Sequence, residues 1–293
     1  MDLAKMTSTR TEAAAWLRAV PAGGPTSPTR SGLVVHPARR LSELVQGRPP
    51  GITGHQWSTA IRELLDQVVC AADTGWPVFA VAFAPPAEPG SPARRAERLT
   101  GTVCAAVGLP LLRVESATLR GADHGRRLVE YVIDARAYAA GTGPDGGDAV
   151  GFRDILGRLP DGRRGPVNDL GALARAAAVA GYVDRALADP ILRGLHVRWT
   201  GGPAEGWGWV EVRPGRCLVE RVRLDVGRFS CGIDPGRLAE DLAALAVGER
   251  LRDLAAGEPP LVARDEVRRQ IRALAARRDE ADGGFAFDHL YAD

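Results

Sequence analysis

The chain has 293 residues, of which 45% are hydrophobic and 25% are charged, a mixture typical of globular proteins and unlike that of disordered or fibrous ones. Its formal net charge is only +2, so the overall charge does not require a nucleic acid or an acidic membrane surface as a partner. The length allows one large domain or two ordinary ones with a sizeable core.

The basic residues are almost all arginines, and the single lysine is Lys5. This excludes a catalytic or phosphate-binding lysine in the folded body. The cysteines Cys70, Cys104, Cys217 and Cys231 lack the paired spacing of a structural zinc site, so buried thiols in a reducing cytoplasm are expected. No signal peptide is evident, and no apolar run approaches the roughly 20 residues that cross a bilayer. We therefore expect a cytoplasmic protein without a membrane partner.

The first part of the chain alternates short apolar segments with breaks rich in glycine and proline. We expect a helix at Thr11–Val20, a linker after it, a short strand at Leu33–His36 and a short helix at Ala38–Val45. A strand begins near Asp66. Val78–Phe83 is apolar at every position, which is typical of a strand buried on both faces.

A helix and a third strand follow. Ala93–Val107 carries apolar residues at helical spacing and ends before Gly108. Leu109–Val114 is a strand with Pro110 near its start, where proline is tolerated. Leu128–Ala140 resembles another helix.

The glycine-rich segment Gly141–Asp148 is the best candidate for a domain boundary. Beyond it we expect helices and a meander of strands: a helix at Asp169–Leu187, strands at Leu195–Thr200, Trp207–Val212 and Cys217–Leu224, and helices at Pro235–Ala256 and Pro260–Arg278. In the second of these strands Trp207 and Trp209 share one face, whereas Gly208 and Val210 share the other. Asp234 is the expected cap of the helix that starts at Pro235. The predicted organisation is an N-terminal helix and linker (1–30), an α/β core (31–140) and an α+β region (150–293).

The core segment resembles a known family. Leu65–Val69 (LDQVV), Pro77–Ala84 (PVFAVAFA) and Gly108–Arg113 (GLPLLR), separated by an arginine-rich helix, are similar to the PD-(D/E)XK, restriction-endonuclease-like core. More narrowly, they resemble a bacterial family of unknown function with that core. The resemblance covers about 50 to 80 residues. It implies an α/β fold with a restriction-endonuclease-like mixed sheet flanked by helices, followed here by a smaller α+β part.

The resemblance also implies a chemistry, namely metal-dependent hydrolysis of a phosphodiester. Such a site needs a divalent ion, and Mg²⁺ needs carboxylates from neighbouring strands. Asp66 matches the first carboxylate. The expected second acid is Ala82, and the acidic position two residues further on is Ala84. Neither alanine can bind a metal, so the active site is degenerate, and a structural Asp66 is the favoured interpretation.

Two further groups of residues remain as candidates. Glu88 or Glu97 would have to replace the missing acid in an active, magnesium-dependent enzyme. The resemblance places the arginines of the helix and the third strand against nucleic acid; these are Arg94, Arg95, Arg98 and Arg113. A solvated helix face explains the same arginines without a ligand.

The favoured hypothesis is a catalytically silent nuclease-like protein that needs no cofactor and binds either nucleic acid (DNA or RNA) or a protein partner. One alternative is an active metal-dependent nuclease with migrated acids, using Asp66 with Glu88 or Glu97. A second alternative is a protein-interaction module with no nucleic-acid role. The sequence indicates no oligomeric state.

Overall fold

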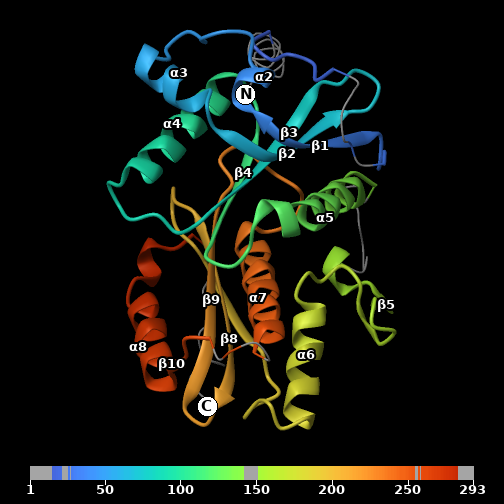
Figure 1. Cartoon of the computed structure of the whole chain (residues 1–293), viewed down its shortest axis with the longest axis vertical. Coiled ribbons are helices and arrows are strands. Elements are labelled where there is room, and N and C mark those ends of the chain that lie inside the picture. The colour runs from blue at the N-terminus through green and yellow to red at the C-terminus, as the bar shows by residue number, and fades with distance from the viewer. Residues whose placement is uncertain are drawn as a thin grey trace. The chain divides into compact units, whose positions relative to one another are not determined.

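The computed structural model describes residues 15–21, 26, 28–141, 151–254, 257 and 259–282 (Figure 1). It divides into two compact units. The first comprises Met1–Glu115, Leu119–Gly141 and Asp225–Gly232, and the second comprises Ser116–Thr118, Thr142–Leu224 and Ile233–Asp293. Both units combine β-sheet with helices, which confirms the expected mixed α/β class.

The first unit contains a mixed sheet. Its strands lie in the order β1 (Leu33–Arg40), β2 (Leu64–Ala71), β3 (Pro77–Ala84) and β4 (Leu111–Ser116). β1 and β2 are antiparallel, as are β2 and β3, whereas β3 and β4 are parallel. Parallel strands need a crossover connection, and helix α4 (Pro92–Ala106) provides it.

The two faces of β3 pack against different helices. Ala80 and Ala82 belong to a core cluster with Val103 of α4. Phe79 points to the other face, where the guanidinium of Arg136 in α5 (Gly121–Gly141) lies 5.4 Å from the ring centroid. Successive side chains of a strand alternate between its two faces. Both faces of β3 are buried, which confirms the prediction and explains why its sequence is uniformly apolar.

The segment before β2 differs from the expectation. β1 continues to Arg40 through residues expected to be helical, and helix α2 spans only Leu41–Leu44. Pro37 lies inside β1, and the pairing with β2 skips Ala38, whose φ is +51°. Because β1 is an edge strand and its pairing is interrupted at Ala38, it can contain a proline.

Two more elements precede β2. Helix α3 (Gly54–Ala60) is capped by Thr53, whose hydroxyl oxygen accepts a hydrogen bond from the amide of Gln56. Of the helix expected at Thr11–Val20, residues 11–14 lie outside the described residues. Residues 15–20 are not helical, and Leu17 instead forms a β-bridge with Val45.

The second unit contains an antiparallel meander, as expected: β7 (Arg193–Arg198), β8 (Ala204–Arg213) and β9 (Arg216–Asp225), with β10 (Val262–Ala263) paired to β9. Its helices and smaller elements are η1 (Phe152–Asp154), the β5–β6 hairpin (Leu156–Arg158 and Arg164–Pro166), α6 (Ala172–Val183), α7 (Pro235–Asp253), α8 (Arg264–Ala275) and η2 (Arg278–Glu280). Asp234 caps α7, because its carboxylate accepts a hydrogen bond from the amide of Arg237. Among the described residues no helix is long and apolar enough to cross a membrane.

The meander is covered by one helix on each face. Val210 packs with Ala244 of α7, whereas Trp207 and Trp209 pack with Val267 of α8. The tryptophans and Val210 therefore lie on opposite faces, as the alternation in the sequence predicts.

Candidate functional site

Asp66 lies on β2 and interacts with the protein backbone. Its Oδ2 accepts a hydrogen bond from the amide of Phe83 on β3, at 2.6 Å. The first residue of α5 is Gly121, at which a Cβ would lie only 2.1 Å from Oδ1 of Asp66. Burial raises the pKa of Asp66, although the Phe83 amide and Arg113 act in the opposite direction. The carboxylate thus joins β2 to β3 beside the start of α5.

A pocket of about 410 Å³ lies beside β3, α4 and the loop that joins them. Ala82 and Ala84, which occupy the expected acid positions, both line it. Glu88 lies on the exposed loop at the pocket and Glu97 lines the α4 side, so the structure brings these two candidates to one pocket. Asp66 is not one of the lining residues.

The polar side of this pocket is a network of opposite charges. The carboxylate of Glu97 lies 3.0 Å from Nη1 of Arg94 and 3.9 Å from Nη1 of Arg113. Arg94 also contacts Glu115 on β4 at 2.7 Å. The side chains of Glu97, Arg113 and Glu115 are only 8–11% exposed. Two carboxylates and two guanidinium groups therefore balance one another in a largely buried position.

The alanines of β3 make room for this network. In the parallel pairing of β3 with β4, Ala82 lies opposite Arg113 and Ala84 lies opposite Glu115. Sequence reasoning did not identify Glu115, although its signal is present. Arg113 and Glu115 are two residues apart on one strand and so point to the same face.

The arginines that were expected to contact nucleic acid fall into two groups. Arg94 and Arg113 form ion pairs inside the protein. Arg95 and Arg98 lie on the exposed side of α4. The second pair is therefore the more accessible to a phosphate.

The donor set does not fit a magnesium ion around Asp66. Among the described residues no group of three or more His, Cys, Asp and Glu side chains is arranged to hold a metal. Glu97 lines the pocket, but Arg94 and Arg113 already balance its charge. Mg²⁺ binding relies on carboxylate oxygens available to the ion.

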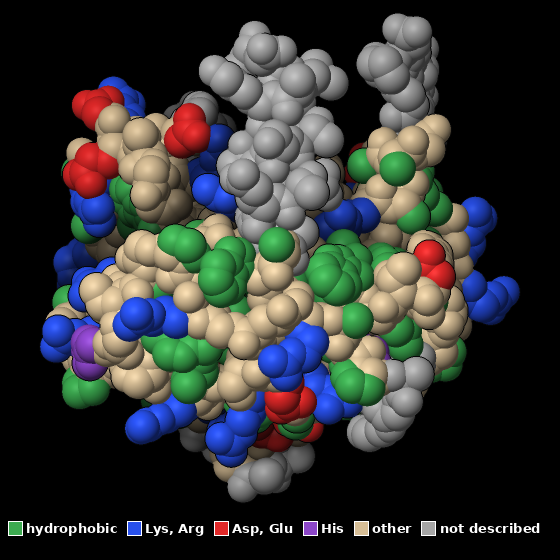
Figure 2. All heavy atoms as spheres, turned by 90° about the horizontal axis from the view of Figure 1, so that it is seen from above, with side chains coloured by type: hydrophobic (Ala, Val, Ile, Leu, Met, Phe, Trp, Pro, Cys, Tyr) green, Lys and Arg blue, Asp and Glu red, His purple; other side chains and the backbone are tan. Residues whose placement is uncertain are grey.

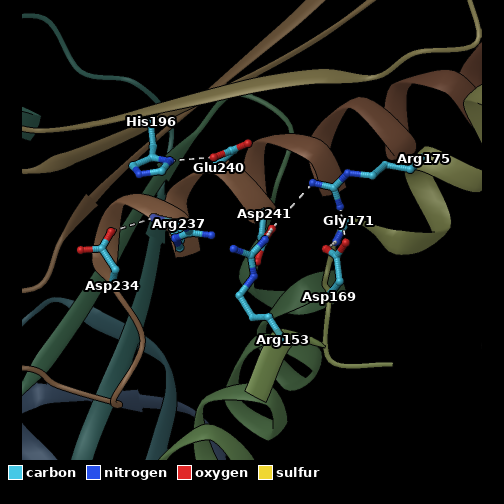
Figure 3. Close-up of polar contacts among 9 residues, drawn as sticks. All are labelled: Arg153, Asp169, Gly171, Arg175, His196, Asp234, Arg237, Glu240 and Asp241. Carbon is cyan, nitrogen blue, oxygen red and sulfur yellow. Dashed lines mark hydrogen bonds and ion pairs between the residues drawn. The ribbon is translucent and has the colours of Figure 1, made fainter. Parts of the chain in front are cut away.

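A separate polar cluster lies in the second unit (Figure 3). Asp241 of α7 is fully buried, and its Oδ1 lies 2.5 Å from Arg153 of η1 and 3.8 Å from Arg175 of α6. Burial raises the pKa of Asp241 to about 7, and the two arginines oppose this effect. Oδ2 of Asp241 has no hydrogen-bond partner in the described part of the chain.

This cluster connects elements that are distant in the sequence. Asp169, just before α6, binds Arg175 and also accepts a hydrogen bond from the amide of Gly171. The signal that sequence reasoning missed is an acid on an apolar helix face, because Asp241 lies between the buried residues Leu238 and Leu245 at helical spacing. A buried, ion-paired carboxylate of this kind positions η1 and α6 against α7.

His196 and Glu240 form a second pair beside this cluster, with Nδ1 of His196 at 2.7 Å from Oε2 of Glu240 (Figure 3). Burial raises the pKa of Glu240, but His196, Arg175 and Arg153 together lower it below its ordinary value. The pair links β7 to α7.

Comparisons with known proteins do not extend this description: no protein-family model matches the chain, and neither a curated protein nor a solved structure does. The function must therefore be inferred from the residues of the pocket and its surroundings.

Proposed function

We propose that this chain is a non-hydrolytic nucleic-acid-binding protein in which a nuclease-like core serves for binding. The observation that carries the proposal is the pocket beside β3. It has alanines at both expected acid positions, and its carboxylate Glu97 is paired with arginines. The strand order of the first unit, with antiparallel β1, β2 and β3 and a helical crossover to β4, is compatible with the resemblance to the PD-(D/E)XK core.

Hydrolysis would need groups that this pocket does not assemble. Phosphodiester cleavage by a metal ion requires an activated water and carboxylates that hold the ion. Asp66 binds the Phe83 amide and does not line the pocket. The single lysine of the chain, Lys5, lies outside the described residues.

Binding to nucleic acid is supported by accessible positive charge. Arg95 and Arg98 are exposed on α4, the helix that also contributes Glu97 to the pocket. The face seen in Figure 2 has arginine side chains spread among apolar ones, with fewer acidic side chains between them. Guanidinium groups bind phosphate oxygens well.

The test is the salt dependence of binding to a labelled single-stranded oligonucleotide. Affinity is expected to fall steeply between about 50 and 200 mM salt, because each phosphate contact releases counterions. The double variant Arg95→Gln/Arg98→Gln should make the slope of log affinity against log salt shallower by about 1.4, or about 0.7 for each phosphate that is no longer neutralised. Arg126→Gln is the matched control for each single variant, Arg95→Gln and Arg98→Gln, since Arg126 is an exposed arginine on α5 that pairs with Glu130.

Two results would overturn the proposal. Absence of binding even at low salt would favour a protein-interaction module with no nucleic-acid role. An equal loss of affinity in the Arg126→Gln control would show that total charge, and not the α4 arginines, determines binding.

The second candidate is an active nuclease with migrated acids. The observation that favours it is that Glu88 and Glu97 line the same pocket. It predicts cleavage of an oligonucleotide in the presence of Mg²⁺ or Mn²⁺ that is abolished by Glu97→Gln or Asp66→Ala. Under the non-hydrolytic proposal, purified wild-type protein and both variants leave the oligonucleotide intact.

A further inference from the structure

We propose that the pocket beside β3 and α4 holds one unpaired guanine base, whose edge is recognised by Glu97 and Arg113. This inference rests on the proposed function for its biological setting, although a free nucleoside tests it separately. It specifies which part of a nucleic acid enters the pocket.

The pocket has the size and lining of a site for a small, flat, mostly apolar group. Its volume of about 410 Å³ falls in the range of about 300–1,000 Å³ that is usual for small-ligand pockets. Apolar side chains form most of its walls, among them Leu65, Ala82, Ala84, Pro85 and Pro86. Such walls can cover the faces of a base, and a few convergent polar groups then determine which base is bound.

Among the polar residues that line the pocket, Glu97 and Arg113 place a strong acceptor next to a strong donor. Oε1 of Glu97 lies 3.9 Å from Nη1 of Arg113, which is an ion-pair distance but too long for a direct hydrogen bond. A base edge that offers a donor next to an acceptor can therefore bind both groups. Oε2 of Glu97 is positioned by Arg94 at 3.0 Å, which leaves Oε1 on the side of Arg113.

Guanine is the base that matches this pair. It carries two neighbouring donors, N1–H and the N2 amino group, that a carboxylate can accept, and its O6 and N7 are acceptors for a guanidinium. Adenine and cytosine offer Glu97 one amino group, next to a ring nitrogen that can accept from Arg113. Uracil and thymine offer Glu97 one N–H beside a carbonyl oxygen, so guanine alone gives the carboxylate two adjacent donor groups and also leaves an acceptor for Arg113.

The space for the base depends on small side chains. Ala82 and Ala84 lie opposite Arg113 and Glu115 on β4, so the alanines leave the arginine accessible from the pocket. The alanines at the two positions where the resemblance expects acids therefore leave room for a ligand. Ala84→Leu is expected to fill part of the pocket without changing the charged network.

The first experiment measures the affinity of guanosine, inosine, adenosine and cytidine by calorimetry. Inosine lacks only the N2 amino group, so wild-type protein should bind guanosine about tenfold more tightly, the lower part of the range for one well-placed base contact. Glu97→Gln should abolish this preference for guanosine, and Ala84→Leu should weaken the binding of all four nucleosides. Glu130→Gln is the matched control, because it removes the same charge from a residue on α5 that does not line the pocket, and it should leave the preference for guanosine unchanged.

The second experiment uses oligonucleotides of thymine with a single central guanine or hypoxanthine. Equal binding of both, together with no preference for guanosine, overturns the guanine site and leaves the proposed function intact. Guanosine binding without oligonucleotide binding at low salt preserves the base site and overturns the proposed function. A guanosine preference that survives in Glu97→Gln shows that Glu97 does not recognise the edge of the base and so overturns that part of the proposal. The absence of both nucleoside and oligonucleotide binding overturns both proposals.

Discussion

The carboxylate of Asp66 accepts a hydrogen bond from the amide of Phe83 and lies against the first residue of α5. At the residue scale, this is what a structural aspartate requires: a backbone donor and close packing. Burial is the main reason why its pKa is raised. The folded protein therefore keeps this proton to a higher pH than the unfolded chain does.

The stability of wild type and that of Asp66→Asn should therefore depend differently on pH. An asparagine can still accept the hydrogen bond from Phe83 but does not titrate. The stability of wild type relative to Asp66→Asn should fall as the pH rises from the unfolded carboxyl pKa of about 3.9 through the raised folded value, and should then become constant. Urea unfolding of both proteins at several pH values measures it. A relative gain of wild-type stability with rising pH would show that the hydrogen bond from Phe83, and not burial, dominates the pKa of Asp66.

Asp66→Ala provides the comparison at a single pH. It leaves the Phe83 amide without its acceptor, and an unsatisfied donor costs about 1–3 kcal/mol. The free energy of unfolding at neutral pH should therefore fall more for Asp66→Ala than for Asp66→Asn.

For the individual residues, the sequence predicted their positions on the elements but not their partners. The position of Asp66 and the two alanines of β3 were visible in the motif. Which arginine pairs with which acid was not, because Arg94, Glu97, Arg113 and Glu115 come together only when α4 crosses over to β4. Spacing along the chain does not determine such partners.

At the scale of elements, strand β8 was predictable because its two faces differ so strongly. Tryptophans face α8, and glycines face α7. A Cβ at Gly206 would lie 2.0 Å from the carbonyl carbon of Ala239, whereas one at Gly208 would lie 3.0 Å from that of Ala243. The glycines therefore allow the backbone of α7 to approach the sheet closely.

These distances predict a graded loss of stability. Gly206→Ala should destabilise the protein by about 3 kcal/mol or more, the upper part of the range for overpacked cores, and Gly208→Ala by about 1 kcal/mol. Gly101→Ala in α4 is the control, because nothing lies within 4 Å of its Cβ. It should be neutral or stabilising by up to about 1 kcal/mol. Urea unfolding measures all three, and equal effects of Gly206→Ala and Gly101→Ala would contradict the close approach.

Elements with a weaker pattern were predicted less well. The continuation of β1 to Arg40 was missed because Pro37 and Ala38 interrupt its alternation, and only the pairing with β2 explains it. Helix α5 starts at Gly121, earlier than the apolar pattern of Leu128–Ala140 indicated. Its first turns are polar or glycine-containing, and their contacts with β2 determine their structure.

At the scale of the whole molecule, both units contain buried cysteine thiols. Cys70, Cys104 and Cys231 lie in the first unit and Cys217 lies in the second. Burial raises the pKa of Cys70 and Cys104 to about 12 and that of Cys217 to about 11. Since the thiolate is the reactive form, the native thiols should be inert.

Labelling with a thiol-reactive reagent at mildly alkaline pH tests this expectation. Native protein should not react at Cys70, Cys104 or Cys217, whereas denatured protein should react at all of them. Mass spectrometry of the labelled peptides identifies each site. Fast labelling of one cysteine without denaturant would show that its unit opens under native conditions.

Most of the expected boundary at Gly141–Asp148 lies outside the described residues. The grouping of residues 225–232 with the first unit was not predicted, because it depends on distant contacts such as Phe229 against Phe79, with ring centroids 5.3 Å apart. Local composition does not reveal a segment that returns to an earlier unit.

The alternation of glycine and tryptophan in β8 has one more consequence. If β8 slid by a single residue against its neighbours, every indole would turn toward the backbone of α7 and every glycine toward α8. A register shift of one residue is thus excluded, because the indoles would overlap the backbone of α7 and the glycines would leave a cavity beside α8. Deleting or inserting one residue within β8 should therefore prevent the second unit from folding.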